Sequence, residues 1–274
     1  MPAQNRPTPR PTASLGLLRD PNWQMSFGER AALEGVVSAL SPRLAIEIGT
    51  AEGGSLGRLA AHSEQVHAFD LSFELLKREI DPERLDNVVF HAGDSHVLLG
   101  ETLAELAREG RRVDFALVDG DHSPEGVKRD VEDLLSAEAV ADTLILVHDT
   151  MNELVRAGLE RVAYENYPGV GYVELDFVPG YMFREPSLRD ELWGGLGLIV
   201  VESERTRPPG QSPRQARYRD AHELIAGAKQ TRLELERHQE WLRAIQGSAS
   251  WRLTAPLRGA ARTLRRAREG DTGR

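Results

Sequence analysis

The sequence predicts a Rossmann-like α/β fold with a doubly wound, mostly parallel sheet of seven strands. Short apolar runs rich in β-branched residues recur between residues 44 and 202. Stretches with helical spacing separate the first five runs, which indicates strands joined by crossovers and therefore parallel. The last two runs follow one another without a long helix, so we expect an antiparallel pair with one reversed edge strand.

Each element can be placed in order along the chain. The capping box Ser26-Phe-Gly-Glu29 predicts a helix over about 28–40. Parallel strands are expected at 44–48, 65–71, 87–91, 113–118 and 143–147. Further helices are expected at 55–62, 73–80, 96–109, 124–137 and 152–165. The closing strands are expected at 171–178 and 196–202.

The α/β domain is expected to cover residues 21–204, after a disordered leader over 1–20 that lacks the apolar stretch of a signal peptide. A linker over 205–213 then precedes a long helix over 214–247 and a tail over 248–274. The helix carries a weak heptad seam that either packs on its own domain or makes the protein a homo-oligomer, most simply a dimer. The seam residues are Ala221, Leu224, Ala228, Thr231, Leu235, His238, Leu242 and Ile245.

Composition excludes several classes of protein. The sequence has no cysteine, which excludes disulfides and thiolate chemistry and fits a cytoplasmic protein. No apolar run reaches the roughly 18–20 residues that a membrane span needs, so we expect a soluble protein. The net charge of −9 combines +5 between Trp251 and Arg274 with −14 in the rest. An acidic body argues against nucleic-acid binding, whereas the basic tail is either solvated or touches an anionic surface.

The turn after the first predicted strand, Leu44-Ala-Ile-Glu-Ile-Gly-Thr-Ala-Glu-Gly-Gly54, has the features of a ligand site. Gly49, Gly53 and Gly54 allow the backbone to approach a ligand without interference from a Cβ atom. Glu47 places a carboxylate near the end of the strand, where it can hold a cationic amino group. The same spacing also roughly fits a dinucleotide-binding turn or a plain strand-to-helix turn, so this turn alone does not choose the ligand.

Acidic residues also end the next two strands. Asp70 ends the second strand, where a carboxylate can accept hydrogen bonds from ribose hydroxyls. Asp94 ends the third strand, at a position suited to the amino group of adenine. Each aspartate alone is equally compatible with a helix N-cap. Acids at three successive strand ends favour a cofactor that contains a nucleoside.

This order of motifs, continued by Val118-Asp-Gly-Asp-His-Ser-Pro-Glu-Gly-Val-Lys-Arg-Asp130 and Leu146-Val-His-Asp-Thr150, resembles the class I methyltransferases. It looks like their branch of small-molecule and sugar O-methyltransferases related to cephalosporin hydroxylase-like proteins, over roughly residues 28–203. The resemblance implies S-adenosyl-L-methionine as the cofactor. It also implies a set of cofactor-binding residues: Glu47, Gly49, Thr50, Ala51, Gly53, Ser55, Asp70, Leu71, Gly93, Asp94, Ser95 and Asp119.

The resemblance further implies a metal site at the ends of the fourth and fifth strands. Metal-dependent members bind magnesium there, at positions that match Asp119, His148 and Asp149. Those members often have glutamate where this chain has His148. An imidazole is a poorer ligand for Mg²⁺ than a carboxylate, and Mn²⁺ tolerates it better. A metal ion is therefore an open alternative.

The position of the general base in the same enzymes matches His122. Histidine titrates near neutrality, so it can take the proton of an acceptor hydroxyl. The alternative is that His122 caps the helix at Ser123-Pro124 or bonds Asp121.

The sequence thus predicts an O-methyltransferase that acts on a hydroxyl of a sugar, glycan or secondary-metabolite acceptor, in natural-product or polysaccharide biosynthesis. Two other functions stay open: an NAD(P)-dependent oxidoreductase, and a non-catalytic assembly protein with a methyltransferase fold. The tail segment 248–258 looks like an ending of bacterial polysaccharide-modifying proteins, which favours a glycan. Five aromatic residues are expected by default to pack in the domain, with a wall or lid of the acceptor pocket as the alternative: Tyr164, Tyr167, Tyr181, Phe183 and Trp193.

Overall fold

The computed structural model describes residues 23–79, 85–182, 191–203, 210–211, 215–254 and 256. The chain divides into two units, Met1–Tyr218 and Arg219–Arg274, which are described separately. The predicted leader, most of the predicted linker and most of the predicted tail lie outside the described residues.

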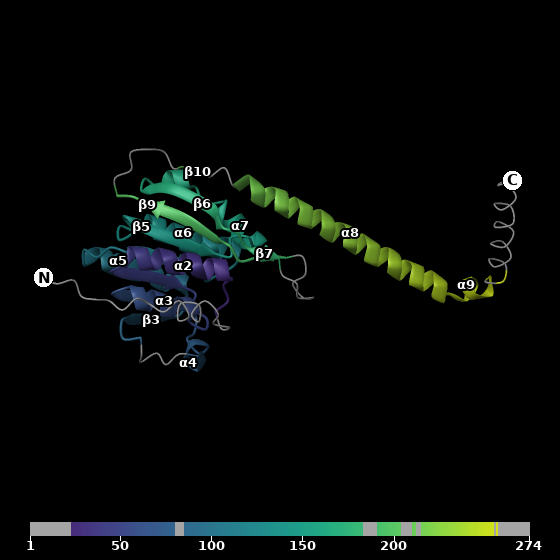
Figure 1. Ribbon diagram of the computed structural model, residues 1–274, viewed down its shortest axis with the longest axis horizontal. Helices are drawn as coiled ribbons and strands as arrows, with labels where there is room; N and C mark the ends of the chain where they lie inside the picture. The colour runs from purple at the N-terminus through teal and green to yellow at the C-terminus, as the bar shows by residue number, and fades with distance from the viewer. Residues whose placement is uncertain are drawn as a thin grey trace. The chain divides into compact units, whose positions relative to one another are not determined.

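The first unit is built on one large sheet with the strand order β10-β6-β9-β5-β4-β1-β2-β3 (Figure 1). Its strands are β1 (Leu44–Ile48), β2 (Gln65–Asp70), β3 (Val88–Ala92), β4 (Phe115–Val118), β5 (Thr143–His148), β6 (Val170–Val178), β9 (Leu196–Val201) and β10 (Gly210–Gln211). A separate two-stranded ribbon consists of β7 (Tyr181–Met182) and β8 (Leu192–Trp193). The helices are α2 (Phe27–Leu40), α3 (Gly54–His62), α4 (Leu76–Glu79), α5 (Ser95–Arg108), α6 (Pro124–Ser136), α7 (Glu153–Leu159) and the 3₁₀ turn η2 (Tyr164–Asn166).

The predicted fold class is confirmed. Strands β1 to β5 are parallel, and the order reverses between β1 and β4, as in a doubly wound sheet. The closing pair is antiparallel, but the reversed strand β9 lies inside the sheet, between β5 and β6, rather than at its edge. The physical reason is visible in the sequence of β9, Leu-Gly-Leu-Ile-Val-Val, which is apolar throughout and therefore suits a central strand.

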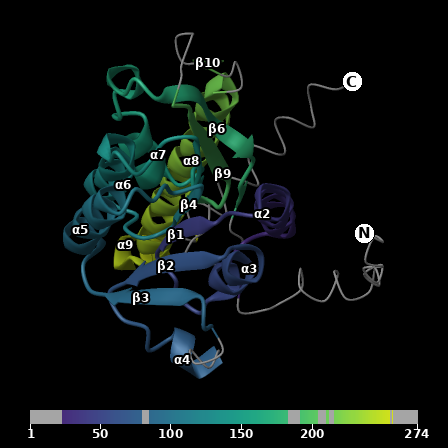
Figure 2. The same cartoon turned by 90° about the vertical axis from the view of Figure 1, so that its left-hand side faces the viewer.

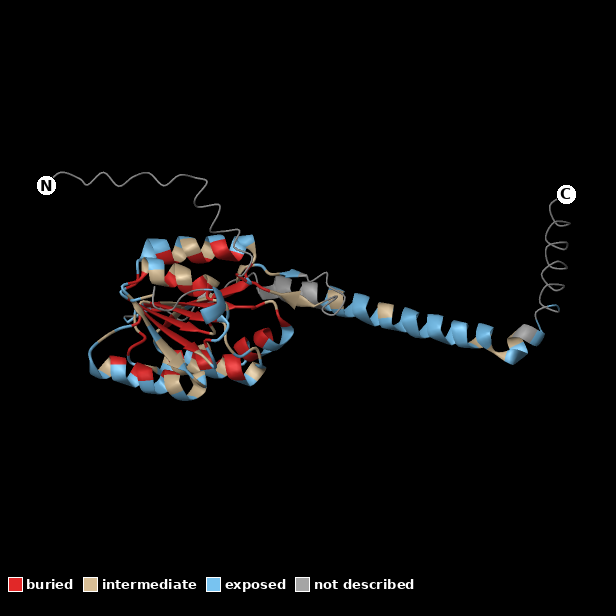
Figure 3. Cartoon of the chain, turned by 90° about the horizontal axis from the view of Figure 1, so that it is seen from below, coloured by how far each residue is buried: buried red, intermediate tan, exposed pale blue. Residues whose placement is uncertain are grey.

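Helices cover both faces of the sheet. Helices α2 and α3 lie on one face, and α5, α6 and α7 lie on the other (Figure 2). Each face has its own apolar core: α2 and α3 contribute Leu33, Val37, Leu56 and Leu59 to one, while α5 and α6 contribute Leu99, Leu103, Val131 and Leu134 to the other. Strands β1, β2, β4 and β5 between these layers are buried almost throughout, whereas the edge strand β3 has no fully buried residue (Figure 3). This frame holds the carboxyl ends of the parallel strands at one fixed edge.

Helix starts follow local chemistry. The predicted capping box is present at α2, where Ser26 and Glu29 each bond the backbone of the other. Helix α6 begins at Pro124 after the N-cap Ser123, whose hydroxyl accepts a hydrogen bond from the backbone of Gly126. These caps set where the loops at the carboxyl edge of the sheet end.

The second unit contains most of α8 (Gln215–Gly247) and α9 (Ala249–Leu253). Most described side chains of α8 are exposed, including Leu224, Leu235 and Leu242 of the predicted seam (Figure 3). Within the described residues, no helix combines the length and apolar character needed to cross a membrane.

Candidate active site

A cavity of about 1030 Å³ opens at the carboxyl ends of the parallel strands. It lies at the point where the strand order reverses, which is where doubly wound sheets bind ligands. There the turn after β1 touches the loop after β4. A Cβ atom on Gly49 would lie 2.1 Å from the carbonyl oxygen of Asp119, and the φ angle of Gly49 is +85°. Only glycine fits at this position.

The structure brings nearly all of the predicted site residues to this one cavity. Glu47 is the exception, because it lies buried behind Thr50, whose hydroxyl donates a 3.0 Å hydrogen bond to its carboxylate. The predicted residues that line the cavity are Gly49, Thr50, Ala51, Gly53, Ser55, Asp70, Leu71, Gly93, Asp94, Ser95, Asp119, His122, His148 and Asp149.

The carboxyl group of Glu47 has an unusual pKa. Burial, assisted by the charges of Asp119 and Asp70, raises this pKa to about 8, although hydrogen bonds from Ser55 and Thr50 act in the opposite direction. One of its oxygens, Oε1, is buried without a hydrogen-bond partner. Glu47 therefore carries a buried acceptor atom without a partner, and a cation that bound beside Thr50 would stabilise its ionised form.

Asp70 and Asp94 already have structural partners. Asp70 Oδ2 accepts hydrogen bonds of 2.9 and 3.0 Å from the backbone amides of Thr50 and Ala51, and so fixes the turn after β1. Asp94 is the N-cap of α5 and accepts from the backbone amide of His96. The alternative role of Asp94 as a helix N-cap is thus confirmed. A carboxylate has about four lone-pair sites, so both side chains can still accept bonds from a ligand.

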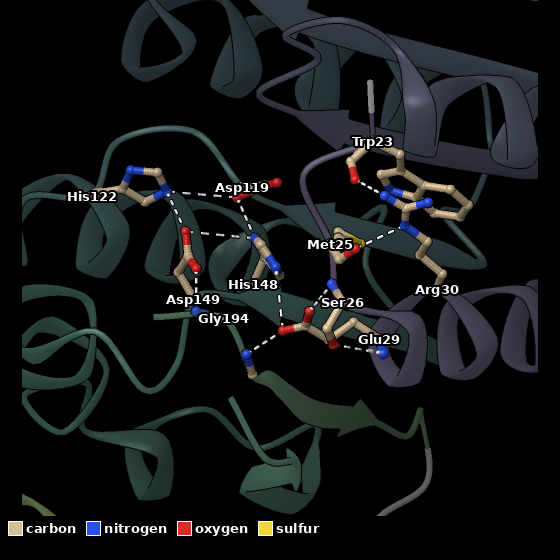
Figure 4. Close-up of polar contacts among 11 residues, drawn as sticks. Trp23, Met25, Ser26, Glu29, Arg30, Asp119, His122, His148, Asp149 and Gly194 are labelled. Atoms are coloured by element: carbon tan, nitrogen blue, oxygen red, sulfur yellow. Dashed lines mark hydrogen bonds and ion pairs between the residues drawn. The ribbon is translucent and has the colours of Figure 1, made fainter. Parts of the chain in front are cut away.

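His122 lies directly beside two carboxylates (Figure 4). Its Nε2 lies 3.1 Å from Asp149 Oδ2 and 3.6 Å from Asp119 Oδ1. These contacts, with Asp119 contributing most, raise the pKa of His122 to about 10. The helix-capping alternative for His122 is wrong, because the capping role falls to Ser123.

His148 lies deeper, between three carboxylates (Figure 4). Its Nδ1 lies 2.9 Å from Asp119 Oδ1 and 3.6 Å from Asp149 Oδ2, while its Nε2 lies 3.5 Å from Glu29 Oε1. Although burial opposes the charged form, these neighbours raise the pKa of His148 well above its usual value. The same contacts hold the pKa of Asp119 below its usual value despite burial.

A metal ion would find a suitable set of donors here. Among the described residues, one ligand atom each from Asp119, His122 and Asp149 lies within 4.8 Å of the other two. Two carboxylate oxygens and one imidazole nitrogen suit Mn²⁺ or Zn²⁺ better than Mg²⁺. The resemblance implies His148 as the third ligand, but in this geometry the third ligand atom comes from His122. The side chain of His148 instead contacts Asp119 and Glu29.

One wall of the cavity was not predicted from the sequence. It is the N-terminal strap, residues 23–26, which lines the cavity beside the turn after β1. Arg30 holds the strap by donating to the carbonyl oxygens of Trp23 and Met25, the latter at 2.7 Å. The Trp23 ring packs so closely on Gly54 that a Cβ atom there would lie 2.5 Å from it. The capping box located the start of α2, but nothing in the sequence indicated that the preceding residues line the cavity.

Two of the predicted aromatic residues line the cavity, Tyr181 from β7 and Trp193 from β8. The Trp193 ring meets the His122 ring edge-on, with centroids 5.9 Å apart. Tyr164 and Tyr167 instead pack against the core, as expected by default for these aromatic residues. Phe183 lies outside the described residues.

Fold and site together consist of a doubly wound α/β sheet with a cavity at the carboxyl ends of its strands, lined in part by Asp119, His122, His148 and Asp149. Residues 46–150 match a family model described as a methyltransferase domain. The chain contains an S-adenosylmethionine-dependent methyltransferase domain, and the alternative of an NAD(P)-dependent oxidoreductase is set aside. No curated protein matches the sequence.

Solved structures also show similarity. An O-methyltransferase from Bacillus cereus, in complex with SAH, is 18% identical, with coverage of 70% of this chain and 92% of that chain and a TM-score of 0.49. The O-methyltransferase TomG from Streptomyces achromogenes, involved in tomaymycin synthesis and in complex with SAM, is 16% identical. That comparison covers 66% of this chain and 83% of TomG, with a TM-score of 0.47.

Proposed function

We propose that the protein is an O-methyltransferase that transfers the methyl group of S-adenosylmethionine to a hydroxyl of a sugar, glycan or secondary-metabolite acceptor. The observation that carries this proposal is the His122–Asp149 contact of 3.1 Å in the wall of the cavity. It supports His122 as the group that takes the proton of the acceptor hydroxyl.

The cofactor would occupy the cavity along the strand ends. Asp70 would accept hydrogen bonds from the ribose hydroxyls, and Gly93, Asp94 and Ser95 would surround the adenine. The turn over Gly49–Ser55, with Leu71 and Asp119 beside it, would hold the rest of the cofactor, beyond its ribose and adenine. Glu47 would attract the amino group of the cofactor directly or through water. Buried Glu47 suits that task because a cation stabilises its ionised form.

The chemistry is an in-line displacement. The acceptor oxygen would form a bond to the methyl carbon while the bond from that carbon to sulfur breaks, so that the donor leaves as a neutral thioether. The acceptor's proton would pass to the imidazole of His122, whose Nε2 faces Asp149 and Asp119. Because the pKa of His122 is raised to about 10, the ring must first lose a proton. A positive sulfonium beside the ring would favour that loss, since a nearby like charge lowers the pKa of a histidine.

A metal-assisted reaction is the second candidate, supported by the donor set Asp119, His122 and Asp149. The side chain of His148 lies at the same carboxylates and would adjust to admit the ion. A bound ion would lower the pKa of the acceptor hydroxyl. The two candidates exclude each other at His122, because a nitrogen bound to metal cannot take a proton.

The wall of the site supports the proposed acceptor class. Tyr181 and Trp193 line the same cavity as the carboxylates of Asp119 and Asp149. Aromatic rings pack on the apolar faces of sugar rings, while carboxylates accept bonds from sugar hydroxyls. These neighbours support a neutral, hydroxylated ring as acceptor.

The test is a screen for transfer of a labelled methyl group to neutral sugars, glycans and phenolic metabolites. With an acceptor in hand, we expect His122→Ala to lower the rate by about 10²-fold or more. The affinity for S-adenosylhomocysteine should stay within about threefold. His238→Ala, at an exposed position on α8, is the matched control and should leave both unchanged.

Two results would count against the proposed base. An unchanged rate in His122→Ala would remove His122 from the chemistry. A rate that vanishes on dialysis against EDTA and returns with Mn²⁺ would favour the metal candidate.

A further inference from the structure

We propose that Glu29 is a positioning residue of this site: its buried carboxylate fixes the imidazole of His148 and the Gly194–Gly195 turn, and through them Asp119 and Asp149. The effect on turnover rests on the proposed function, whereas the structural part can be tested without it.

The starting observation is that Glu29 is wholly buried, although it sits in the first turn of α2 as the glutamate of a capping box. Glutamate is among the residues least often buried completely unless it is paired. The capping box needs only one carboxylate oxygen, Oε2, which accepts from the backbone amide of Ser26. The second oxygen is therefore available for another role.

That second oxygen, Oε1, points toward the end of β5 (Figure 4). It accepts a hydrogen bond from the backbone amide of Gly195 and lies 3.5 Å from Nε2 of His148. The two nitrogens of an imidazole are fixed relative to each other in one rigid ring, so a partner at Nε2 restricts the direction in which Nδ1 points. Here Nδ1 meets Asp119 Oδ1 at 2.9 Å, the oxygen that His122 also faces.

The same carboxylate reaches Asp149 by a second route. Gly194 and Gly195 have φ angles of +71° and +88°, and their consecutive amides donate to Asp149 and Glu29, the former at 2.7 Å. Moving Glu29 would thus disturb the donor to Asp149 as well as His148. Since Glu29 also holds the backbone of Ser26, it joins the N-terminal strap to both carboxylates that face His122.

Helix α2 offers a matched comparison. Glu34, one turn and a half further along, forms a similar pair with His62, whose Nε2 lies 3.0 Å from Glu34 Oε1. Glu34 also bonds Arg58 and does not line the cavity. Glu29→Gln and Glu34→Gln therefore make the same chemical change on the same helix, with only the first touching the candidate site.

The experiment is ¹⁵N NMR of the full chain labelled at its eight histidines. In the wild-type protein we expect His148 to carry a proton on Nε2, held by Glu29. Glu29→Gln should shift the ¹⁵N signals of His148 and of His122, and leave His62 unchanged. Glu34→Gln should shift His62 alone.

A His148 that lacks a proton on Nε2 in the wild-type protein would overturn the proposal, even if Glu29→Gln failed to fold. Unchanged His148 signals in Glu29→Gln would overturn it too. Neither result depends on cofactor binding. The NMR experiment therefore tests the role of Glu29 separately from the proposed methyl transfer. With an acceptor in hand, Glu29→Gln should lower kcat on the order of tenfold with little change in cofactor affinity, and Glu34→Gln should lower neither.

Discussion

At the scale of single residues, Glu47 has the property that most directly links burial to binding. It is fully buried beneath the turn after β1, and burial raises its pKa to about 8. Below that pH the free protein holds Glu47 mostly as a neutral acid, and above it as a carboxylate. A cationic amino group binds the carboxylate better than the acid. Cofactor affinity should therefore rise as the pH rises through this range.

This gives a prediction for Glu47→Gln, which keeps the shape of the side chain and removes its titration. For wild-type protein, the affinity for S-adenosylhomocysteine should increase on the order of tenfold between about pH 6 and about pH 9. For Glu47→Gln it should stay nearly flat over the same range. Calorimetric titration at several pH values measures both. Parallel pH dependences in the two proteins would show that Glu47 does not face the amino group.

Site residues could be predicted from the sequence where they directly follow a predicted strand. Asp70, Asp119 and Asp149 meet because parallel strands bring their carboxyl ends to one edge of the sheet. Glu29 and Gly195 could not be paired in this way, because 166 residues separate them and their contact depends on how α2 packs across the sheet. The capping box already accounts for a glutamate at position 29, so the sequence did not indicate the second contact of this side chain.

At the scale of elements, the N-terminal strap and helix α3 form a tightly fitted pair. Trp23 is buried on the first residue of α3, Gly54, and Arg30 lies over the Trp23 ring at 5.1 Å from its centroid. The strap thus closes the side of the cavity next to the turn after β1. The close packing leaves no room for a methyl group between the two elements.

We therefore expect Gly54→Ala to push the strap away from the turn. A Cβ atom there would lie 2.5 Å from Trp23, so the variant should bind S-adenosylhomocysteine at least about tenfold more weakly and melt at a lower temperature. Gly57→Ala, on the same helix with open space around it, is the control. It should bind normally and gain about 0.5–1 kcal/mol of stability from helix propensity. Calorimetry and thermal unfolding measure the two effects, and equal binding by both variants would rule out a role for the strap.

Element boundaries in the sheet were predictable because burial on both faces leaves a clear apolar pattern. The run at 44–48 matches β1, and that at 171–178 differs from β6 by one residue. The place of β9 between β5 and β6 was not predicted, because strand pairing depends on the path of the chain after α7. The uninterrupted apolar sequence of β9 was the available signal.

At the scale of the whole molecule, helix α8 raises the question of assembly. Its predicted seam is largely exposed, with Leu224 at 75% and Leu235 at 56% of their full exposure. We propose that two copies pair along this seam to form a dimer, as the alternating spacing of three and four residues suggests.

The prediction is that Leu235→Glu combined with Leu242→Glu turns the dimer into a monomer, because both side chains lie in the seam and charges at such positions repel. Leu233→Glu is the control, since Leu233 is also exposed but lies outside the seam. Light scattering with size-exclusion chromatography gives the masses. A monomeric wild-type protein, or the same mass for all three, would contradict the dimer.

We expect the cavity at the carboxyl ends of β1 to β5 to bind a methyl-donor cofactor, and calorimetric titration of the full chain with S-adenosylhomocysteine measures this binding. Saturable binding at one site is predicted. Asp70→Asn should weaken it at least about tenfold, because the variant loses the carboxylate that holds the turn after β1 and is expected to hold the ribose. Absence of binding at millimolar S-adenosylhomocysteine, or tighter binding of NADH, would contradict it.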